Sequence, residues 1–432
     1  MMKRFTRLGV VMALLLFAAC VESENTPTTA APTTAAPAPE TTAPPASGTT
    51  TLTDAPAEIV IGNAIAMSGP NSAGAGLSQI PSYDLWVADV NERGGIYVAE
   101  YDQRIPVRIE RVDTTSDAGT AVQLVQQLLE RDDIHFLLPP WGTGFNMAIL
   151  DIVNEFQTPV LGCTLSSAAL AANPGSNQYF YVMLNQPSQQ GAALVALLVD
   201  LGVESVAIIH HDDLHGIEVN DVVEPALEDA GIETLSNQTY PVNTDDLDQV
   251  LRNAQASGAQ ALLAFSYPAE TFLMTGQMRA IGYSPDLFYA TVGVAFPVYP
   301  GPIAGAGAEG VMGAGAWNPN VDIEGARDYF DRHVAMHGAE PDRWASAACY
   351  ASGQVLEQAI EAAGTLDPIA VKEAMDTTEF NTILGTFRFE NNFNPVYPGQ
   401  VGQWQNGEFE IIAPTSARTA EPIFPKPAWP TE

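Results

Sequence analysis

Basic residues are scarce in this chain of 432 residues. It has 17 Lys and Arg against 51 Asp and Glu, which gives a formal net charge of −34, and no Lys or Arg occurs between Val21 and Glu92. An acidic surface repels both phosphate backbones and anionic lipid headgroups. We therefore expect no nucleic-acid partner and no electrostatic docking on a membrane. The acidity itself favours solubility or a saline habitat over a role in ligand chemistry.

Cysteine and catalytic motifs are also few. A disulfide-rich scaffold is excluded, because the chain has only three cysteines, Cys20, Cys163 and Cys349. The sequence leaves open whether Cys163 and Cys349 are bonded to each other. There is no GK[ST] phosphate loop and no G-x-S-x-G nucleophile motif. Ser166 and His215 have no orienting acid that would make a catalytic triad. We expect a protein that is not an enzyme and has no cofactor.

One segment of the chain contains several residues of the types that bind metal ions. His210, His211 and His215 lie in "HHDDLH", with two aspartates between them. The segment passes from a strand end into a loop, and no second group of ligands is evident. We expect no metal there, and interpret these residues as the polar rim of a cleft.

The N-terminus has the order of a secretory signal. Three basic residues within the first seven precede an apolar run, Leu8 to Phe17, and then Ala18-Ala19-Cys20. The run is too short to span a bilayer permanently. Two small residues before a cysteine resemble a bacterial lipoprotein signal, so residues 1–20 are expected to be the signal and Cys20 the lipidation site. A plain secretory signal is the alternative.

Residues 21–56 are expected to be a disordered tether. They are mostly Thr, Ala, Pro, Ser and Gly, including "PTTAAPTTAAPAPETTAPP". Such a segment has too little apolar surface to bury and stays extended. We expect an extracytoplasmic module, anchored to the cell membrane through Cys20.

The rest of the chain alternates strand and helix, and the order occurs twice. The first series has strands at 59–66, 107–112, 135–138 and 159–162, with helices at 83–91, 120–131 and 148–156. The second has strands at 205–210, 237–240 and 261–265, with helices at 219–230 and 247–256. This pattern predicts an α/β protein with two similar doubly wound lobes. Ligands of such sheets bind beyond the carboxyl ends of the strands, here in a cleft between the lobes.

An ordered set of segments resembles a known family. These are "IVIGNAIAMSGPNSAG", "VADVNERGGI", "RIPVRIERVDTTSD", "PVLGCTLSSAAL", "HHDDLHGIEV", "AEGVMGAGAW" and "GTFRFENN…GQWQNGEFEII". Over residues 57–412 the chain is similar to substrate-binding proteins of ABC importers, of the leucine/isoleucine/valine-binding, type I periplasmic binding protein kind. The resemblance implies a three-strand hinge. Lobe 1 would comprise 57–184 plus 316–400, and lobe 2 would comprise 185–315 plus 401–432.

The resemblance also implies the ligand contacts. Two loops of lobe 1 match those that hold a carboxylate through hydroxyls and helix N–H groups, although Ser and Thr also cap helices routinely. Lobe 2 contributes His215 and Tyr267 at positions where the family has aromatic residues. Tyr350 matches another aromatic residue at the cleft, although it could equally be part of the core. The implied contacts are Trp141, Gly142, Thr143, Thr164, Ser166, His215, Tyr267 and Tyr350.

The departures bear on the ligand. Val292 stands where amino-acid binders carry the carboxylate that pairs with the ligand's ammonium, and Gly74-Ala75-Gly76 replaces an aromatic residue. A buried ammonium without a partner is costly. Either Glu270 or Asp213 replaces the missing carboxylate, or the solute has no α-ammonium.

The resemblance implies a monomer that captures a small polar organic solute, such as a branched-chain amino acid or a related amide or carboxylate. It would deliver that solute to the permease subunits of an ABC importer. The alternative is a ligand-sensing lipoprotein of the same fold that reports to a membrane receptor.

Overall fold

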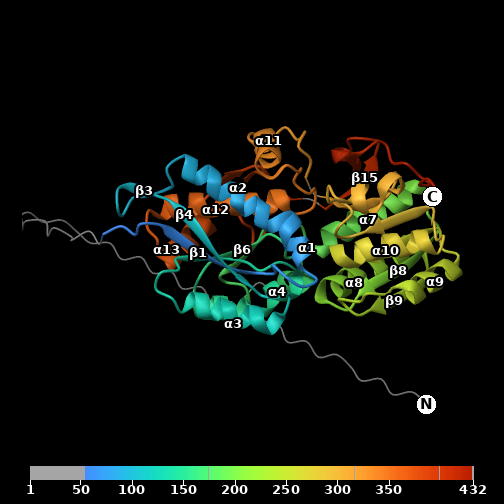
Figure 1. The fold of residues 1–432 in the computed structure, drawn as a ribbon, viewed down its shortest axis with the longest axis horizontal. Coiled ribbons are helices and arrows are strands. Elements are labelled where there is room, and N and C mark those ends of the chain that lie inside the picture. Colours follow the sequence, from blue (N-terminus) through green and yellow to red (C-terminus); the bar gives the residue numbers. More distant parts are fainter. Residues whose placement is uncertain (1–53, 174, 316, 398, 431–432) are drawn as a thin grey trace, which may run out of the picture. The chain divides into compact units, whose positions relative to one another are not determined.

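The computed structural model describes residues 54–430 except 174, 316 and 398 (Figure 1). The expected signal 1–20 with Cys20, and the tether as far as residue 53, lie outside the described residues. Within the described ranges, no helix is long and apolar enough to cross a membrane.

Lobe 1 is built on a parallel sheet with the first strand of the chain at its centre. β1 (Ile59–Ile65) is buried along its whole length and pairs with β4 (Val107–Asp113) and β5 (Phe136–Leu138). β6 (Val160–Gly162) and β7 (Phe180–Val182) form a second parallel pair. A strand covered on both faces needs a nearly continuous apolar sequence, as "IVIGNAI" provides.

Helices cover both faces of this sheet. Ile61 and Ile65 face a core shared with α2 and α12, whereas Ala64 faces one shared with α3 and α5. The helices of lobe 1 are α1 (Ser72–Gly74), η1 (Ala75–Gln79), α2 (Ile80–Glu92), α3 (Ala118–Leu129), α4 (Thr143–Ala148), α5 (Leu150–Glu155), α6 (Ala168–Ala172), α11 (Ala326–His337), α12 (Ser346–Ala363) and α13 (Pro368–Thr377). Two small hairpins complete it: β2 (Ile96–Val98) with β3 (Gln103–Ile105), and β13 (Phe380–Thr382) with β14 (Gly385–Phe387).

Lobe 2 is built on a seven-stranded sheet in the order β16-β15-β12-β11-β10-β8-β9. The parallel strands are β8 (Ser205–His211), β9 (Glu233–Tyr240), β10 (Ala261–Phe265), β11 (Leu287–Ala290) and β12 (Met312–Gly315). β15 (Gln400–Gln405) and β16 (Glu408–Ala413) extend it in antiparallel fashion. Its helices are α7 (Pro187–Leu201), α8 (Leu214–Asp229), α9 (Asp248–Ser257), α10 (Pro268–Ala280), η2 (Tyr299–Ile303), η3 (Gly305–Ala308) and η4 (Thr415–Ala417).

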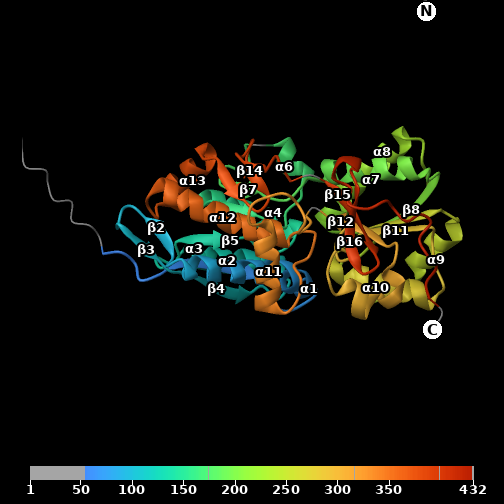
Figure 2. The same cartoon turned by 90° about the horizontal axis from the view of Figure 1, so that it is seen from above.

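The chain passes between the lobes three times, after β7, after β12 and after β14. The late helices α11, α12 and α13 therefore lie with lobe 1, and the last two strands lie with lobe 2 (Figure 2). The predicted fold class is confirmed: the protein is α/β, with two similar lobes. The strands and helices expected from the alternating pattern are all present, but α8 begins at Leu214 and β9 at Glu233, earlier than expected, so that His215 lies in a helix and not in a loop.

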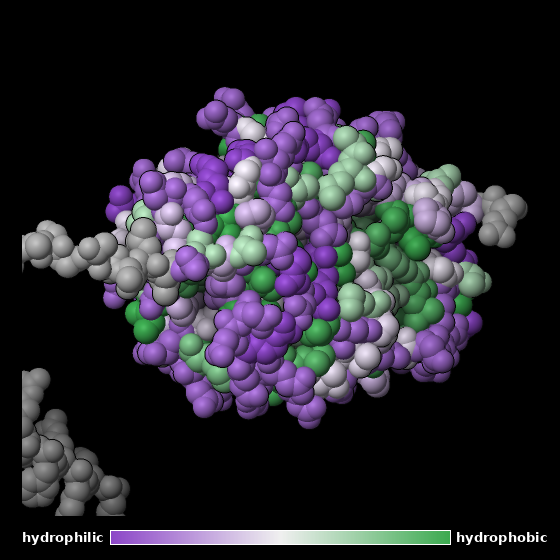
Figure 3. Space-filling view, turned by 60° about the vertical axis from the view of Figure 1, so that its left-hand side comes forward, coloured by the Kyte–Doolittle hydropathy of each residue, from purple (hydrophilic) through white to green (hydrophobic). Residues whose placement is uncertain are grey.

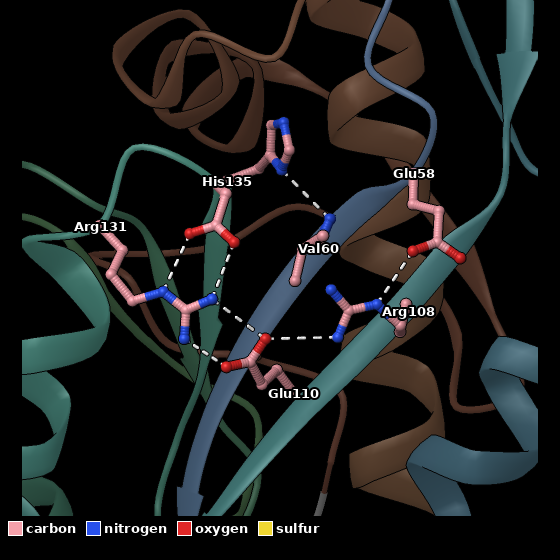
Figure 4. A network of polar contacts seen from close by, with 7 residues as sticks. Glu58, Val60, Arg108, Glu110, Arg131 and His135 are labelled. Atoms are coloured by element: carbon pink, nitrogen blue, oxygen red, sulfur yellow. Dashed lines mark hydrogen bonds and ion pairs between the residues drawn. The ribbon is translucent and has the colours of Figure 1, made fainter.

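The surface reflects the acidic composition. Hydrophilic residues cover most of the face seen in Figure 3. On the edge strand β4, Arg108 bonds both Glu58 and Glu110, and Arg131 joins Glu110 to Asp133 (Figure 4). Each exposed pair contributes little to stability, because water and salt screen it. Charges along an edge strand nevertheless discourage pairing with another chain.

Candidate functional site

The candidate site lies where the strand-end loops of the two lobes meet. Lobe 1 contributes the loop between β5 and α4 and the loop after β6, and lobe 2 contributes the loops after β8, β10 and β11. Helices α4 and α8, one from each lobe, contact each other there (Figure 1). This is the edge at which open α/β sheets bind ligands.

The two loops of lobe 1 bond to each other. The Gly142 N–H donates to Thr164 Oγ1 at 3.1 Å, and the Thr143 hydroxyl donates to the Ser166 carbonyl at 3.3 Å. Gly142 has φ of 98°, a conformation that favours glycine. The Ser166 hydroxyl accepts from Gln190 Nε2 at 3.2 Å. The structure thus brings together four of the residues singled out in the sequence, and their hydroxyls already have partners.

Tyr267 joins the two lobes. Its hydroxyl accepts from the Thr143 N–H at 3.3 Å and donates to Asp213 Oδ2 at 2.8 Å. Its ring packs edge-on against Trp141, with centroids 5.0 Å apart. Burial, with help from the Asp213 carboxylate, raises the pKa of Tyr267 well above its ordinary value, so the phenol stays protonated. The helix N–H of Thr143, which we expect to meet a ligand, donates to this phenol in the structure, and its contact with a ligand stays a prediction.

Two neutral histidines pack against the Tyr267 ring. His215 stacks on it at 10° with centroids 5.4 Å apart, and His211 lies 4.5 Å away. Burial lowers the pKa of His215 to about 4 and that of His211 well below its ordinary value. Thr291 donates its hydroxyl proton to the Ser266 carbonyl at 2.9 Å, so His215 Nε2 is the donor in its 3.2 Å bond to Thr291.

Trp141 explains one departure from the family pattern. A Cβ on Gly74 would lie 2.2 Å from Trp141 Cζ2, so the indole occupies the space that a side chain at position 74 would need. Its Nε1 donates to Ser78 Oγ at 3.1 Å, and the side chain is buried. The aromatic group missing from the first loop is therefore supplied by the loop after β5.

Two other residues named from the sequence have different surroundings. The Tyr350 hydroxyl donates to Asp89 Oδ2 at 2.6 Å, and its ring packs against Tyr329 between helices of lobe 1. Val292 is fully buried, and its carbonyl accepts from the Thr271 hydroxyl at 2.6 Å. The loop after β11 therefore brings no charge to the site at position 292.

A pocket of about 220 Å³ opens beside Tyr267, between the lobes. Three of its lining residues are carboxylates, and no Lys, Arg or His is among them. The lining is Asn71, Ser116, Asp117, Ala118 and Phe145 from lobe 1, with Asp213, Val242, Asn243, Tyr267 and Glu270 from lobe 2. Of these, Asp213, Tyr267 and Glu270 were singled out from the sequence. The lobe 1 residues at 71 and 116–118 were missed, although "SGPNSA" and "TTSD" contain Asn71, Ser116 and Asp117.

A disulfide borders the site. Cys163, which directly precedes Thr164, is bonded to Cys349 on α12, with Cα atoms 4.9 Å apart. The bond settles the pairing that the sequence left open. It ties the second ligand loop to a helix 186 residues further along the chain.

Comparisons with known proteins agree with this geometry. Leu/Ile/Val-binding protein homolog 7 of Brucella suis is 23% identical over 400 residues, covering 86% of this chain and 95% of that protein. The leucine binding protein LivK of Thermotoga maritima has a TM-score of 0.72 at 18% identity, covering 82% of this chain and 98% of its own. LivJ of Streptococcus pneumoniae, solved with isoleucine, has a TM-score of 0.73 at 17% identity, covering 85% and 100%.

A solute-binding protein of Rhodopseudomonas palustris, solved with benzoate, is equally similar in fold. Its TM-score is 0.72 at 16% identity, covering 84% of this chain and 98% of its own. At such identities the solved structures establish the fold alone. The family model described as "Periplasmic binding protein" matches residues 58–408 of this chain. With the two lobes, the strand-end loops and that match, the chain belongs to the periplasmic binding protein family.

Proposed function

We propose that this protein captures a small polar organic solute outside the cytoplasm and delivers it to the permease subunits of an ABC importer. The observation that carries the proposal is the meeting of the two lobes at Tyr267, beside a pocket lined from both sides. Closure of such lobes encloses a solute, and the closed form differs in shape from the open one. That difference is what a membrane partner would recognise.

The relatives support the solute class. One is named as a leucine-binding protein and one was solved with isoleucine, whereas another of the same fold was solved with benzoate. A branched-chain amino acid, or a related amide or carboxylate, fits the size of the pocket. The protein would bind this solute without turnover.

We also propose that Cys20 carries a lipid and that the following segment tethers the module to the membrane. A tether raises the effective concentration of the module at its membrane partner. In cells that are given labelled fatty acid, the label should therefore appear on the full chain. It should not appear on the Cys20→Ala variant.

The capture function is tested by a thermal-shift screen of the full chain in detergent against amino acids, short-chain amides, urea and aromatic acids. A bound solute stabilises the folded state by mass action, by about 2.7 kcal/mol at a hundredfold excess over Kd. Turnover of the hit would contradict the proposal, and uptake that is lost without this chain would establish delivery.

A further inference from the structure

The inter-lobe pocket is acidic on both sides. Asp117 lines it from lobe 1, and Asp213 and Glu270 line it from lobe 2. Because no Lys, Arg or His is among the lining residues, the pocket itself supplies no counter-charge. Carboxylates held together in this way attract a cation.

Glu270, one of the residues that line the pocket, has a buried carboxylate oxygen without a hydrogen-bond partner. Its side chain is 3% exposed, and its Oε1 accepts from the Asn243 N–H at 3.1 Å, whereas its Oε2 has no hydrogen-bond partner. A carboxylate in the first turn of α10 is favourable beside the helix N-terminus. That role accounts for an acidic residue at this position, but it leaves Oε2 unused. A buried acceptor without a partner is costly and marks a place for an absent donor.

Asp213 lies on the same side of the pocket. Its Oδ2 is held by the Tyr267 hydroxyl, and its Oδ1 approaches lobe 1 closely, 2.6 Å from where a Cβ on Gly144 would be. Asp213 comes from the loop after β8 and Glu270 from the first turn of α10, whereas position 292, after β11, is an uncharged valine. The negative charge of lobe 2 is thus present, but on different elements.

Resting on the proposed function, we propose that Glu270 and Asp213 bind a primary ammonium group of the solute. An ammonium has only donors, and the carboxylates have only acceptors, so Glu270 Oε2 gains the partner it lacks. Asp117 adds attraction from the opposite lobe, which favours closure around the cation.

A small organic molecule fits the pocket better than a metal ion. The described part of the chain holds no group of three His, Cys, Asp or Glu side chains placed to bind a metal. The pocket of about 220 Å³ is also several times the ~30 Å³ that one water occupies in the liquid. The ring of Phe145 in its lining offers an apolar surface for the rest of the solute.

Four probes of the same carbon skeleton test the charge requirement by calorimetry on the full chain at pH 7.5. They are L-leucine, 4-methylpentan-1-amine, 4-methylpentanoate and 4-methylpentanamide, followed by a wider panel of amines and uncharged solutes. We expect binding by compounds that carry an ammonium, and at least tenfold weaker binding by their uncharged or anionic counterparts.

Two variants test the assigned residues. Glu270→Gln and Asp213→Asn keep the shape of each side chain and should weaken the ammonium ligand at least tenfold. Glu228→Gln, which removes the same charge from the exposed face of α8, should bind like wild type. Denaturant unfolding of each variant shows that it is folded.

The outcomes separate the two proposals. Equal affinity for probes with and without the ammonium, or wild-type affinity in both Glu270→Gln and Asp213→Asn, would overturn the ammonium site and leave solute capture intact. If no compound of the whole panel binds the wild-type chain, solute capture fails and the ammonium site fails with it.

Discussion

Gly144 sets how closely the lobes approach at the site. A Cβ at this position would lie 2.6 Å from Asp213 Oδ1, a contact that real Cβ atoms do not make. Gly144→Ala should therefore force the Asp213 carboxylate out of its present position and weaken solute binding, without unfolding either lobe. Calorimetry measures the affinity, and small-angle scattering with saturating solute measures closure.

Gly276→Ala is the matched control for that change. Gly276 lies in α10, and nothing lies within 4 Å of the place that a Cβ would take, so alanine there should stabilise the helix by about 0.5–1 kcal/mol and leave binding unchanged. Normal binding by Gly144→Ala would show that the lobes do not close through this contact.

Glu270 should make the solute-free protein less stable at neutral pH. Burial, with the nearby Asp213 charge, raises its pKa above the ordinary value of 4.5. A raised carboxyl pKa favours folding at low pH, and this stability is lost as pH rises from about 4.5 through the folded pKa. Asp213 and Asp117 line the same pocket, and the Tyr240 phenol lies close to Glu270.

Glu270→Gln should therefore be more stable than wild type at pH 7.5, on the order of 1 kcal/mol, with the difference vanishing towards pH 4. Urea unfolding of the solute-free chain at several pH values measures it. Loss of stability on substitution at pH 7.5 would show that the carboxylate serves the fold rather than a ligand.

The site loops of lobe 1 could be predicted from the sequence, whereas the contacts of Tyr267 could not. The loops at 141–143 and 164–166 could be placed because the family resemblance assigns both to the ligand site, and each directly follows a parallel strand of lobe 1, β5 or β6. The partners of Tyr267 could not be placed, since Thr143 and Asp213 belong to different lobes. No local pattern reports how two separately folded surfaces meet.

At the scale of elements, Glu218 links α8 of lobe 2 to the start of α6 in lobe 1. Its carboxylate accepts from the Ser167 hydroxyl at 3.0 Å and from the N–H groups of Ala168 and Ala169 at 2.9 and 3.1 Å. A helix start has unpaired N–H groups, and a charged acceptor bonds them strongly. Leu170 anchors α6 in the core of lobe 1, so the bond joins the two lobes.

Glu218→Gln should weaken closure, because the uncharged amide accepts through only one of its two end atoms. We expect about 1–3 kcal/mol less stabilisation of the closed form, and hence roughly fivefold or greater loss of solute affinity. Calorimetry measures the loss, with Glu228→Gln on the same helix as control. An unchanged affinity would mean that the contact is equally present in the open form.

At the scale of the whole molecule, the repeated alternation of strands and helices was sufficient for the fold class. A strand buried on both faces and an amphipathic helix each leave a local pattern, as β1 and α3 do. The assignment of α11, α12 and α13 to lobe 1 leaves none. That placement depends on chain crossings after β12 and β14, which are set by how the two sheets bury their faces.

The Cys163–Cys349 bond stabilises lobe 1 by joining segments that are distant in the sequence. Closing a loop of 186 residues restricts the unfolded chain, which by the loop-entropy model stabilises the fold by about 5 kcal/mol. The double variant Cys163→Ser/Cys349→Ser should therefore lose stability of this size in urea unfolding. Because lobe 2 lacks the bond, its transition should stay near the wild-type midpoint, and the two lobes should unfold in separate steps.

Reductant provides the control for this prediction. It should lower the wild-type stability to that of the double variant and leave the variant unchanged. Since Cys163 directly precedes Thr164, a saturating solute should raise the midpoint of the weakened lobe 1 in the variant. A single shifted transition would instead mean that the lobes unfold as one cooperative unit, with the inter-lobe contacts at Tyr267 and Glu218 strong enough to couple them.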